Sequence, residues 1–176
     1  CAVLIPELLE EMPYEVFATS AIDALIHAAE SYLSPKASPY TELFSLEAIR
    51  LIISGFTKVL AEGESARMAL LSDFLMASNM AGIAFANAGT GAVHAMSYPL
   101  SGKYHVTHGE ANYQFFTAVF KEYRRQRPEG KILTLEALIA KELGCEADKV
   151  YDALESLLDR IIPRKPLNAY GMTDPE

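Results

Sequence analysis

The sequence predicts an all-α domain, and two observations carry this prediction. Apolar residues recur with a period near 3.6 through most of the chain, and Pro, Gly and Ser residues separate the periodic runs. The chain has 176 residues, of which 51% are apolar and 22% are charged, so its composition is globular and it can bury a sizeable core. We therefore expect one helical domain around a hydrophobic core.

The first two helices are expected over residues 14–34 and from residue 39 to about 63, where apolar side chains follow the helical period. The first ends before Pro35, because the residue that precedes a proline avoids the helical region. The second begins with Ser38 as N-cap and Pro39 in the first helical position.

A third helix is expected over about residues 65–87, with apolar residues on nearly every side, which is typical of a core helix. Residues 87–91 (Asn-Ala-Gly-Thr-Gly) break this helix, and a short helix could start at Ala92. Three more periodic runs predict helices over about residues 110–125, 132–143 (closed by Gly144) and 147–162.

The two ends of the chain depart from the helical pattern. Residues 1–5 (Cys-Ala-Val-Leu-Ile) form an apolar run typical of a buried strand, although no second strand is evident to pair with it. Residues 173–176 have the pattern of a capping box, which predicts the start of another helix. We expect a larger parent protein, with a sheet-containing part before residue 1 and more helix after residue 176.

Charge and cysteine content argue against several classes of function. The 23 acidic and 15 basic residues give a net charge of −8, which disfavours binding to nucleic acid. No apolar run approaches the roughly 18 residues needed to cross a membrane, and no segment has the pattern of an export signal. Cys1 and Cys145 make no disulfide framework. We expect a cytoplasmic protein that binds neither nucleic acid nor a membrane.

The histidines are the best candidates for chemistry. Asp23 and His27 are four residues apart, so both project from one face of the first helix. His94 follows the glycine break, and His108 precedes the next helix. One carboxylate and three imidazoles suit Fe²⁺ or Zn²⁺, whereas Ca²⁺ and Mg²⁺ prefer oxygen ligands. The sequence therefore indicates a candidate metal site of Asp23, His27, His94 and His108.

A purely structural role for these four residues stays open. An Asp-x-x-x-His pair on a helix is most often part of an exposed surface, and a histidine after a glycine break is as often a cap or a core residue as a ligand. Two further functions also stay open: an all-helical metal-dependent hydrolase and a helical interaction domain with no catalytic role. Helical phosphohydrolases carry an adjacent His-Asp pair, which this sequence lacks.

Two long motifs resemble the signatures of the iron-containing (group III) alcohol dehydrogenases. They are residues 20–32 (Ser-Ala-Ile-Asp-Ala-Leu-Ile-His-Ala-Ala-Glu-Ser-Tyr) and residues 82–109, which contain Ala-Asn-Ala-Gly-Thr-Gly-Ala-Val-His. The resemblance covers essentially the whole chain. It implies that residues 13–176 are the helical, dehydroquinate synthase-like metal-binding domain, truncated at its C-terminus. Residues 1–12 would be a strand remnant and linker from a preceding Rossmann-like cofactor domain.

By this resemblance, the protein would interconvert a primary alcohol and an aldehyde with NAD or NADP. Its metal, Fe²⁺ or Zn²⁺, would be held by Asp23, His27, His94 and His108. Phe85 would line the pocket that the substrate shares with the nicotinamide. Its partners would be the small-molecule substrate, the missing N-terminal cofactor domain and, as in many members, a second copy. The chain alone is expected to be inactive.

Residues 98–112 most resemble members of the family that interconvert 4-hydroxybutyrate and succinate semialdehyde. We predict that Lys103 binds the substrate carboxylate; the alternative is an ordinary surface lysine. Many members have a second histidine, proposed to relay a proton, where this chain has Tyr98. A tyrosine with a pKa of about 10 is a poorer proton carrier. Tyr98 and His105 are therefore both candidates for proton transfer, as is a cofactor ribose with water.

Overall fold

The computed structural model describes residues 2–172, and no strand occurs among them, which confirms the predicted all-α fold class. The α-helices in this part of the chain are α1 (Tyr14–Leu33), α2 (Pro39–Glu62), α3 (Arg67–Ala88), α4 (Ala92–Tyr104), α5 (His108–Gln126), α6 (Lys131–Leu143) and α7 (Val150–Ile161). Short 3₁₀ helices are η1 (Pro6–Leu9), η2 (Glu64–Ala66), η3 (Ala147–Lys149) and η4 (Leu167–Tyr170).

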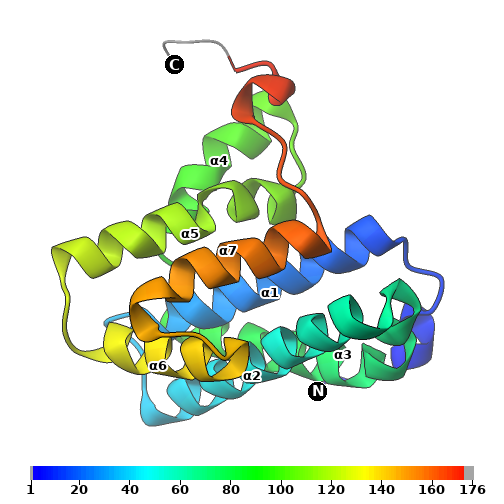
Figure 1. Ribbon diagram of the computed structural model, residues 1–176, viewed down its shortest axis with the longest axis horizontal. Helices are drawn as coiled ribbons and strands as arrows, with labels where there is room; N and C mark the ends of the chain where they lie inside the picture. Colours follow the sequence, from blue (N-terminus) through cyan, green and yellow to red (C-terminus); the bar gives the residue numbers. More distant parts are fainter. Residues whose placement is uncertain (1, 173–176) are drawn as a thin grey trace.

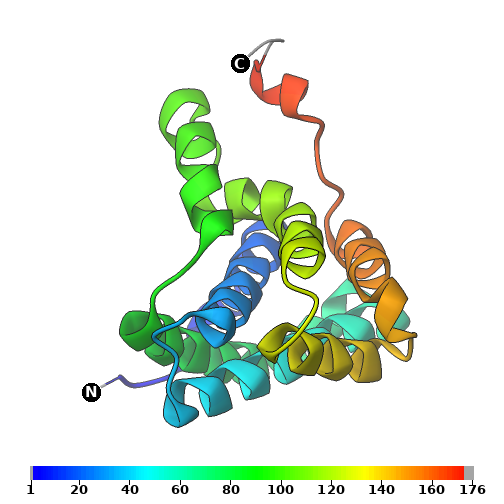
Figure 2. The ribbon, with the colours of Figure 1, turned by 90° about the vertical axis from the view of Figure 1, so that its left-hand side faces the viewer.

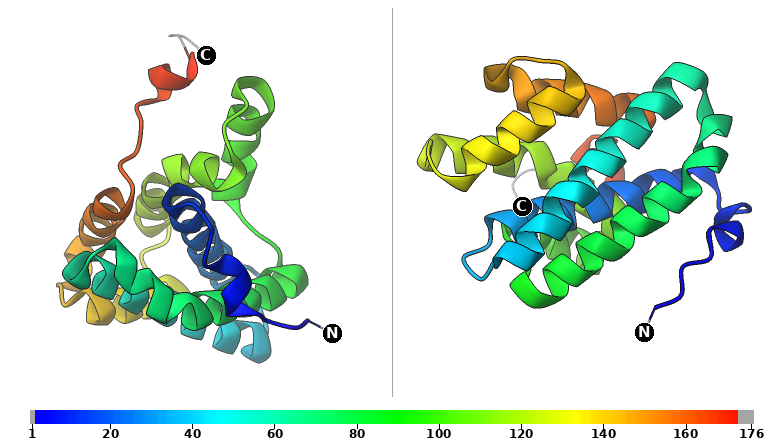
Figure 3. Two further views of the ribbon diagram at one scale, coloured as in Figure 1. Left: turned by 90° about the vertical axis from the view of Figure 1, so that its right-hand side faces the viewer. Right: turned by 90° about the horizontal axis from the view of Figure 1, so that it is seen from below.

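Helix α1 lies at the centre of the bundle and contacts α2, α3, α5 and α6 (Figure 1). Helices α2 and α3 run side by side on one side of it, as the view from below in Figure 3 shows. Helix α7 packs on α5, α6 and α2. Helix α4 contacts α5 and projects from the body of the bundle (Figure 2). A small apolar cluster that includes Leu100, Val106 and Ala111 holds this projection, and Tyr170 of η4 packs against it.

The core is centred on α1, which buries twelve of its twenty residues. Helix α3 buries only six of its 22, and most of these are alanines. The prediction of a core helix over residues 65–87 is therefore wrong for part of α3, where four large apolar side chains are 38–42% exposed: Met68, Met76, Ile83 and Phe85. Apolar content alone does not show which of two similar helices is surrounded by the others.

The segment Glu64–Ala88 is also long and apolar enough to cross a membrane, judged by length and composition only. This departs from the expectation that no segment would reach that length. Helices that pack on the core of a soluble protein meet the same criterion, and the buried residues of α3 lie where it contacts α1 and α2. The finding is therefore weak evidence for a membrane span.

Two predicted helix ends are confirmed in atomic detail. At the start of α2, the Ser38 hydroxyl accepts a hydrogen bond from the Thr41 N–H at 3.3 Å, and the Thr41 hydroxyl accepts one from the Ser38 N–H at 2.8 Å. This reciprocal pair is a capping box. At the end of α6, Gly144 is left-handed with φ of 66°, as its position predicts.

The chain ends differ from the sequence prediction. The strand predicted over residues 1–5 is wrong for the described residues 2–5, which have no regular secondary structure; Val3 is 78% exposed. A strand needs a partner for its backbone hydrogen bonds, and the described residues offer none. The capping box predicted at residues 173–176 lies outside the described residues.

Two helix boundaries near the candidate site also differ from the prediction. Helix α4 is not short: it has 13 residues and continues through Pro99. Pro99 has no backbone N–H to donate to the carbonyl of Ala95, but both residues are exposed, so water can donate to that carbonyl instead. Helix α5 begins at His108, two residues before the predicted start. The candidate ligand His108 is thereby fixed in the first turn of a helix.

Candidate metal centre

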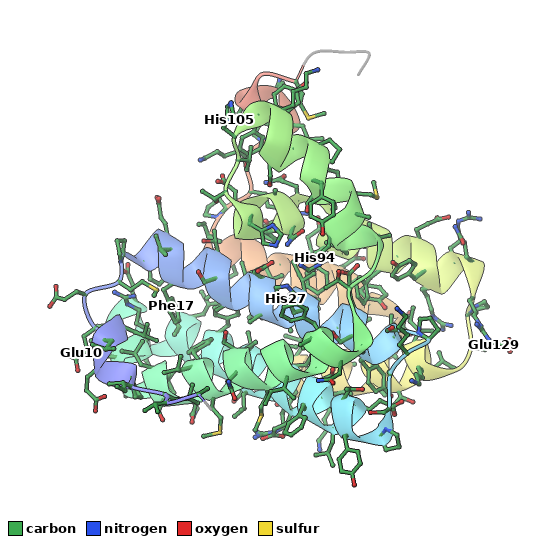
Figure 4. The ribbon with its side chains drawn as sticks, turned by 180° about the vertical axis from the view of Figure 1, so that it is seen from behind. Glu10, Phe17, His27, His94, His105 and Glu129 are labelled. Carbon is green, nitrogen blue, oxygen red and sulfur yellow. The ribbon has the colours of Figure 1, made fainter. Side chains whose placement is uncertain are left out.

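Four side chains from three helices converge at the centre of the molecule. Asp23 and His27 come from α1, His94 from the first turn of α4, and His108 from the first position of α5. One ligand atom from each lies within 4.8 Å of the others. Figure 4 shows the His27 and His94 side chains close together where the two helices meet. No second cluster of this kind occurs within residues 2–172.

The separations fit a single divalent ion. The Nε2 atoms of His94 and His27 are 3.0 Å apart, and Asp23 Oδ1 lies 3.7 Å from His94 Nε2 and 3.8 Å from His108 Nε2. Tetrahedral ligands that are each about 2.1 Å from a metal lie roughly 3.4 Å from one another. Three nitrogen donors and one carboxylate oxygen suit Fe²⁺ or Zn²⁺ better than Ca²⁺ or Mg²⁺.

Glycine residues allow these helices to approach α1. A Cβ on Gly109, next to His108, would lie 2.5 Å from the carbonyl oxygen of Thr19 in α1. A Cβ on Gly91, just before α4, would lie 2.8 Å from Glu30 Oε1. Neither position has room for a larger residue, so the two glycines help to place His94 and His108 against α1.

Electrostatics favour the neutral, metal-binding form of His27. Its burial lowers the pKa of the imidazole, Asp23 opposes this effect, and His94 and His108 add to the lowering. A neutral imidazole keeps a lone pair on one ring nitrogen, as metal ligation requires.

Two buried polar residues, Glu30 and Asn112, contact the cluster, and the sequence analysis did not single them out. The Asn112 side-chain amide donates to Asp23 Oδ1 at 2.6 Å and lies 3.1 Å from His108 Nε2. Glu30 lies 2.7 Å from the Nδ1 atom of His94. A sequence signal exists for both: Glu30 is three residues after His27, and Asn112 is four after His108, so each shares a helix face with a candidate ligand.

A cavity of about 990 Å³ opens beside the cluster. Asp23, His27 and His108 line it on one side, together with Phe85. The Phe85 ring stacks on the His27 imidazole, with ring centroids 4.3 Å apart and an interplanar angle of 22°. The structure therefore places Phe85 next to the candidate ligands.

Tyr98, Lys103 and His105 are not brought to the cluster. Tyr98 is 60% exposed, and the Lys103 Nζ lies 5.1 Å from the centre of the Tyr104 ring. His105 ends α4 in the left-handed conformation, far along the projection from His94 (Figure 4). None of the three lines the cavity, whose cationic side chains are Arg164 and Lys165.

Residues 17–176 match the protein-family model for the Fe-containing alcohol dehydrogenase family, C-terminal. The chain belongs to this family. Its relatives include the 4-hydroxybutyrate dehydrogenase of Clostridium kluyveri, which is 51% identical to this chain over 175 residues. The match covers 99% of this chain and 47% of that protein. Long-chain-alcohol dehydrogenase 1 of Geobacillus thermodenitrificans is 42% identical over 63% of this chain and 28% of its own length.

Solved structures of this family have the same fold. A 1,3-propanediol oxidoreductase structure superimposes with a TM-score of 0.82 and 32% identity, over 96% of this chain and 44% of that one. The iron-containing alcohol dehydrogenase of Thermococcus thioreducens gives a TM-score of 0.79 and 28% identity, over 98% of this chain and 43% of that one. The chain thus spans about half the length of these dehydrogenases or less. Its family membership argues against the hydrolase and the non-catalytic interaction domain.

Proposed function

We propose that this chain is the metal-binding part of an NAD- or NADP-linked alcohol dehydrogenase, and that Asp23, His27, His94 and His108 hold Fe²⁺ or Zn²⁺. The convergence of four suitable donor atoms within 4.8 Å carries the proposal. Membership of the iron-containing alcohol dehydrogenase family supports it. The cofactor domain would correspond to the part of the relatives' length that this chain does not span. The protein would act in the cytoplasm.

A bound divalent ion with an open position would supply Lewis-acid polarisation of a substrate oxygen, and the nicotinamide would supply the hydride chemistry. The chain's own residues orient and enclose the reactants. Asn112 holds the carboxylate of Asp23 by a hydrogen bond. Phe85 covers one face of His27 and is 38% exposed, so it presents an apolar wall to the cavity. Such a wall excludes water from the reacting atoms.

We further propose 4-hydroxybutyrate and succinate semialdehyde as the substrate pair. The 51% identity to the Clostridium kluyveri enzyme supports this assignment. The substrate carboxylate needs a cation, for which Lys103 is the sequence-based proposal and Lys165 is a cation that lines the cavity. Both cations of the cavity already have carboxylate partners. Arg164 pairs with Asp159 and Glu155. Lys165 pairs, among the described residues, with Glu110 alone, at 3.2 Å, and its side chain is 63% exposed.

Proton transfer by Tyr98 or His105 is a proposal that rests on the family resemblance. Both side chains are exposed to water. If the Tyr98 hydroxyl transfers the proton, Tyr98→Phe lowers kcat and changes its pH profile. An unchanged profile would favour His105 or a water that contacts the cofactor ribose.

The direct test is NAD(P)H formation by the protein that carries this chain, purified anaerobically and supplied with 4-hydroxybutyrate. We expect activity in the wild type and a loss of at least about a thousandfold in the double variant His94→Ala, His108→Ala, since Lewis-acid activation contributes several kcal/mol. A metal-loaded, folded wild type that reduces neither NAD nor NADP with any short alcohol or hydroxy acid would contradict the proposal.

A further inference from the structure

A fully buried carboxylate lies behind the candidate ligand His94. The Glu30 side chain is 0% exposed and comes from α1, one turn after His27. Its Oε2 atom accepts a hydrogen bond from the Gly91 N–H at 2.9 Å and lies 2.7 Å from His94 Nδ1. Its Oε1 atom accepts a hydrogen bond from the Val93 N–H at 2.7 Å.

These contacts determine which nitrogen of His94 carries the proton. A carboxylate is an acceptor only, and its two oxygens already accept from two backbone N–H groups. The Nδ1 atom of His94 must therefore donate to Glu30, which leaves the lone pair on Nε2. That Nε2 atom is the one that faces His27 and Asp23, at 3.0 and 3.7 Å. The ligand lone pair thus points into the candidate metal centre.

The same carboxylate also fixes the position of the His94 backbone. Helix α4 has no side-chain N-cap of its own, because Gly91 occupies that position. Glu30 satisfies the N–H groups of Gly91 and Val93, and the Tyr123 hydroxyl accepts from the Ala92 N–H between them at 2.9 Å. Negative charge at a helix N-terminus is also favoured by the helix dipole. The Glu30 carboxylate therefore holds both the backbone next to His94 and the His94 imidazole.

We propose that Glu30 is a positioning residue of the metal centre, which holds His94 in the Nδ1-protonated tautomer and aims its Nε2 lone pair at the ion. This inference rests on the proposed function, because it concerns the same metal site. A carboxylate behind a histidine ligand raises the basicity of the ligand, and loss of such a partner weakens metal binding by about 10- to 100-fold.

The variant Glu30→Gln separates this role from simple helix capping. If the glutamine oxygen still accepts from Val93, its NH₂ group faces His94 Nδ1 and favours a proton on Nε2, which blocks the ligand atom. Tyr123→Phe is the matched control, because it removes a hydrogen bond to the same helix terminus and does not touch the imidazole. Both variants weaken the start of α4, but only the first alters His94.

The experiment measures Zn²⁺ affinity by competition with a chromophoric chelator, in the protein that carries this chain. We expect about 10- to 100-fold weaker binding for Glu30→Gln and less than about threefold change for Tyr123→Phe, with circular dichroism as the check of folding. Equal affinity of Glu30→Gln and wild type, or an equal loss in Tyr123→Phe, would overturn the proposal.

A second readout needs neither metal nor the variant. ¹⁵N NMR of the metal-free wild type at neutral pH reports the tautomer of His94, and we expect Nδ1 to carry the proton. A proton on Nε2 would overturn the role of Glu30, even if the variant fails to fold. A wild type that shows the expected tautomer but binds neither Zn²⁺ nor Fe²⁺ would instead contradict the proposed function.

Discussion

The three candidate histidine ligands are held by different neighbours and to different degrees. The His94 side chain is 4% exposed and contacts Glu30; that of His27 is 17% exposed and is covered by Phe85. The His108 side chain is 48% exposed. The candidate centre is thus buried towards α1 and α4, and exposed towards the cavity at α5.

Recognition of a substrate carboxylate can be tested at the two candidate lysines. Lys165 lines the same cavity as His27 and His108, whereas Lys103 does not. We therefore expect Lys165→Ala to raise the KM for 4-hydroxybutyrate by about tenfold, more than Lys103→Ala does, because a charged hydrogen bond contributes about 1.5 kcal/mol. The KM for 1-butanol, which has no carboxylate, is the control and stays unchanged in both. A larger rise of this KM in Lys103→Ala than in Lys165→Ala would contradict the prediction and favour Lys103 as the carboxylate-binding residue.

The sequence indicates the four candidate ligands through local patterns, such as the shared helix face of Asp23 and His27, and through the family resemblance. Spacing alone does not show that the four residues converge. The sequence does not predict that Glu30 contacts His94, because this pair is 64 residues apart in the chain. Such a contact depends on how α4 packs against α1, which no local pattern specifies.

Close packing of α5 against α1 at Gly109 is a requirement at the level of the helices. In Gly109→Ala, the new Cβ would meet the backbone oxygen of Thr19 at 2.5 Å, so one helix must shift. Overpacking of this kind costs about 1–3 kcal/mol, more than the roughly 1 kcal/mol that alanine gains over glycine in a helix. We expect a lower free energy of unfolding in urea and weaker metal binding.

Gly102→Ala is the matched control for this prediction. Gly102 lies in α4, and a Cβ there meets no atom within 4 Å. This substitution should leave stability unchanged or raise it by up to about 1 kcal/mol. A Gly109→Ala protein as stable as the Gly102→Ala protein would show that α5 does not pack on α1 as described.

The contact between α5 and α7 predicts a dependence of stability on acid pH. Partial burial raises the pKa of Asp159, but hydrogen bonds from Arg164 and Tyr113 outweigh this effect and lower it. The hydrogen bond from Arg164 likewise lowers the pKa of Glu155, with a smaller contribution from Lys121. Both carboxylates therefore bind fewer protons in the folded state than in the unfolded state.

This difference stabilises the fold above the unfolded pKa values of about 4, and the stabilisation is lost as the pH falls through the folded values. We expect the Tm of the wild type to fall more steeply between pH 6 and pH 3 than that of Arg164→Met, in which both pKa values return towards normal. Parallel Tm curves for the two proteins would contradict the expectation.

Helix positions are the part of the fold that the sequence predicts best, since caps and periodicity are local. Ser38 begins α2 and Gly144 ends α6 where expected. The exposure of apolar residues of α3 is not predicted, because α1 and α3 are similarly apolar and only packing determines which is enclosed. The predicted strand at residues 1–5 also depends on a partner that no local pattern supplies.

The candidate metal centre forms only when α1, α4 and α5 pack together, because its four donors come from these helices. Ion binding should therefore stabilise the entire fold, by about 2.7 kcal/mol at a free metal concentration 100 times the Kd. We expect removal of the metal by a chelator to lower the Tm of the wild type and to leave the Tm of His94→Ala, His108→Ala unchanged. An equal decrease in both proteins would show that the ion acts elsewhere.

The most direct test of the metal centre is elemental analysis of the protein that carries this chain, purified anaerobically beside the double variant His94→Ala, His108→Ala. The proposed site predicts about one Fe or Zn per chain in the wild type and none in the folded variant. A well-folded wild type that retains neither metal after both have been supplied would contradict the assignment of Asp23, His27, His94 and His108 as ligands.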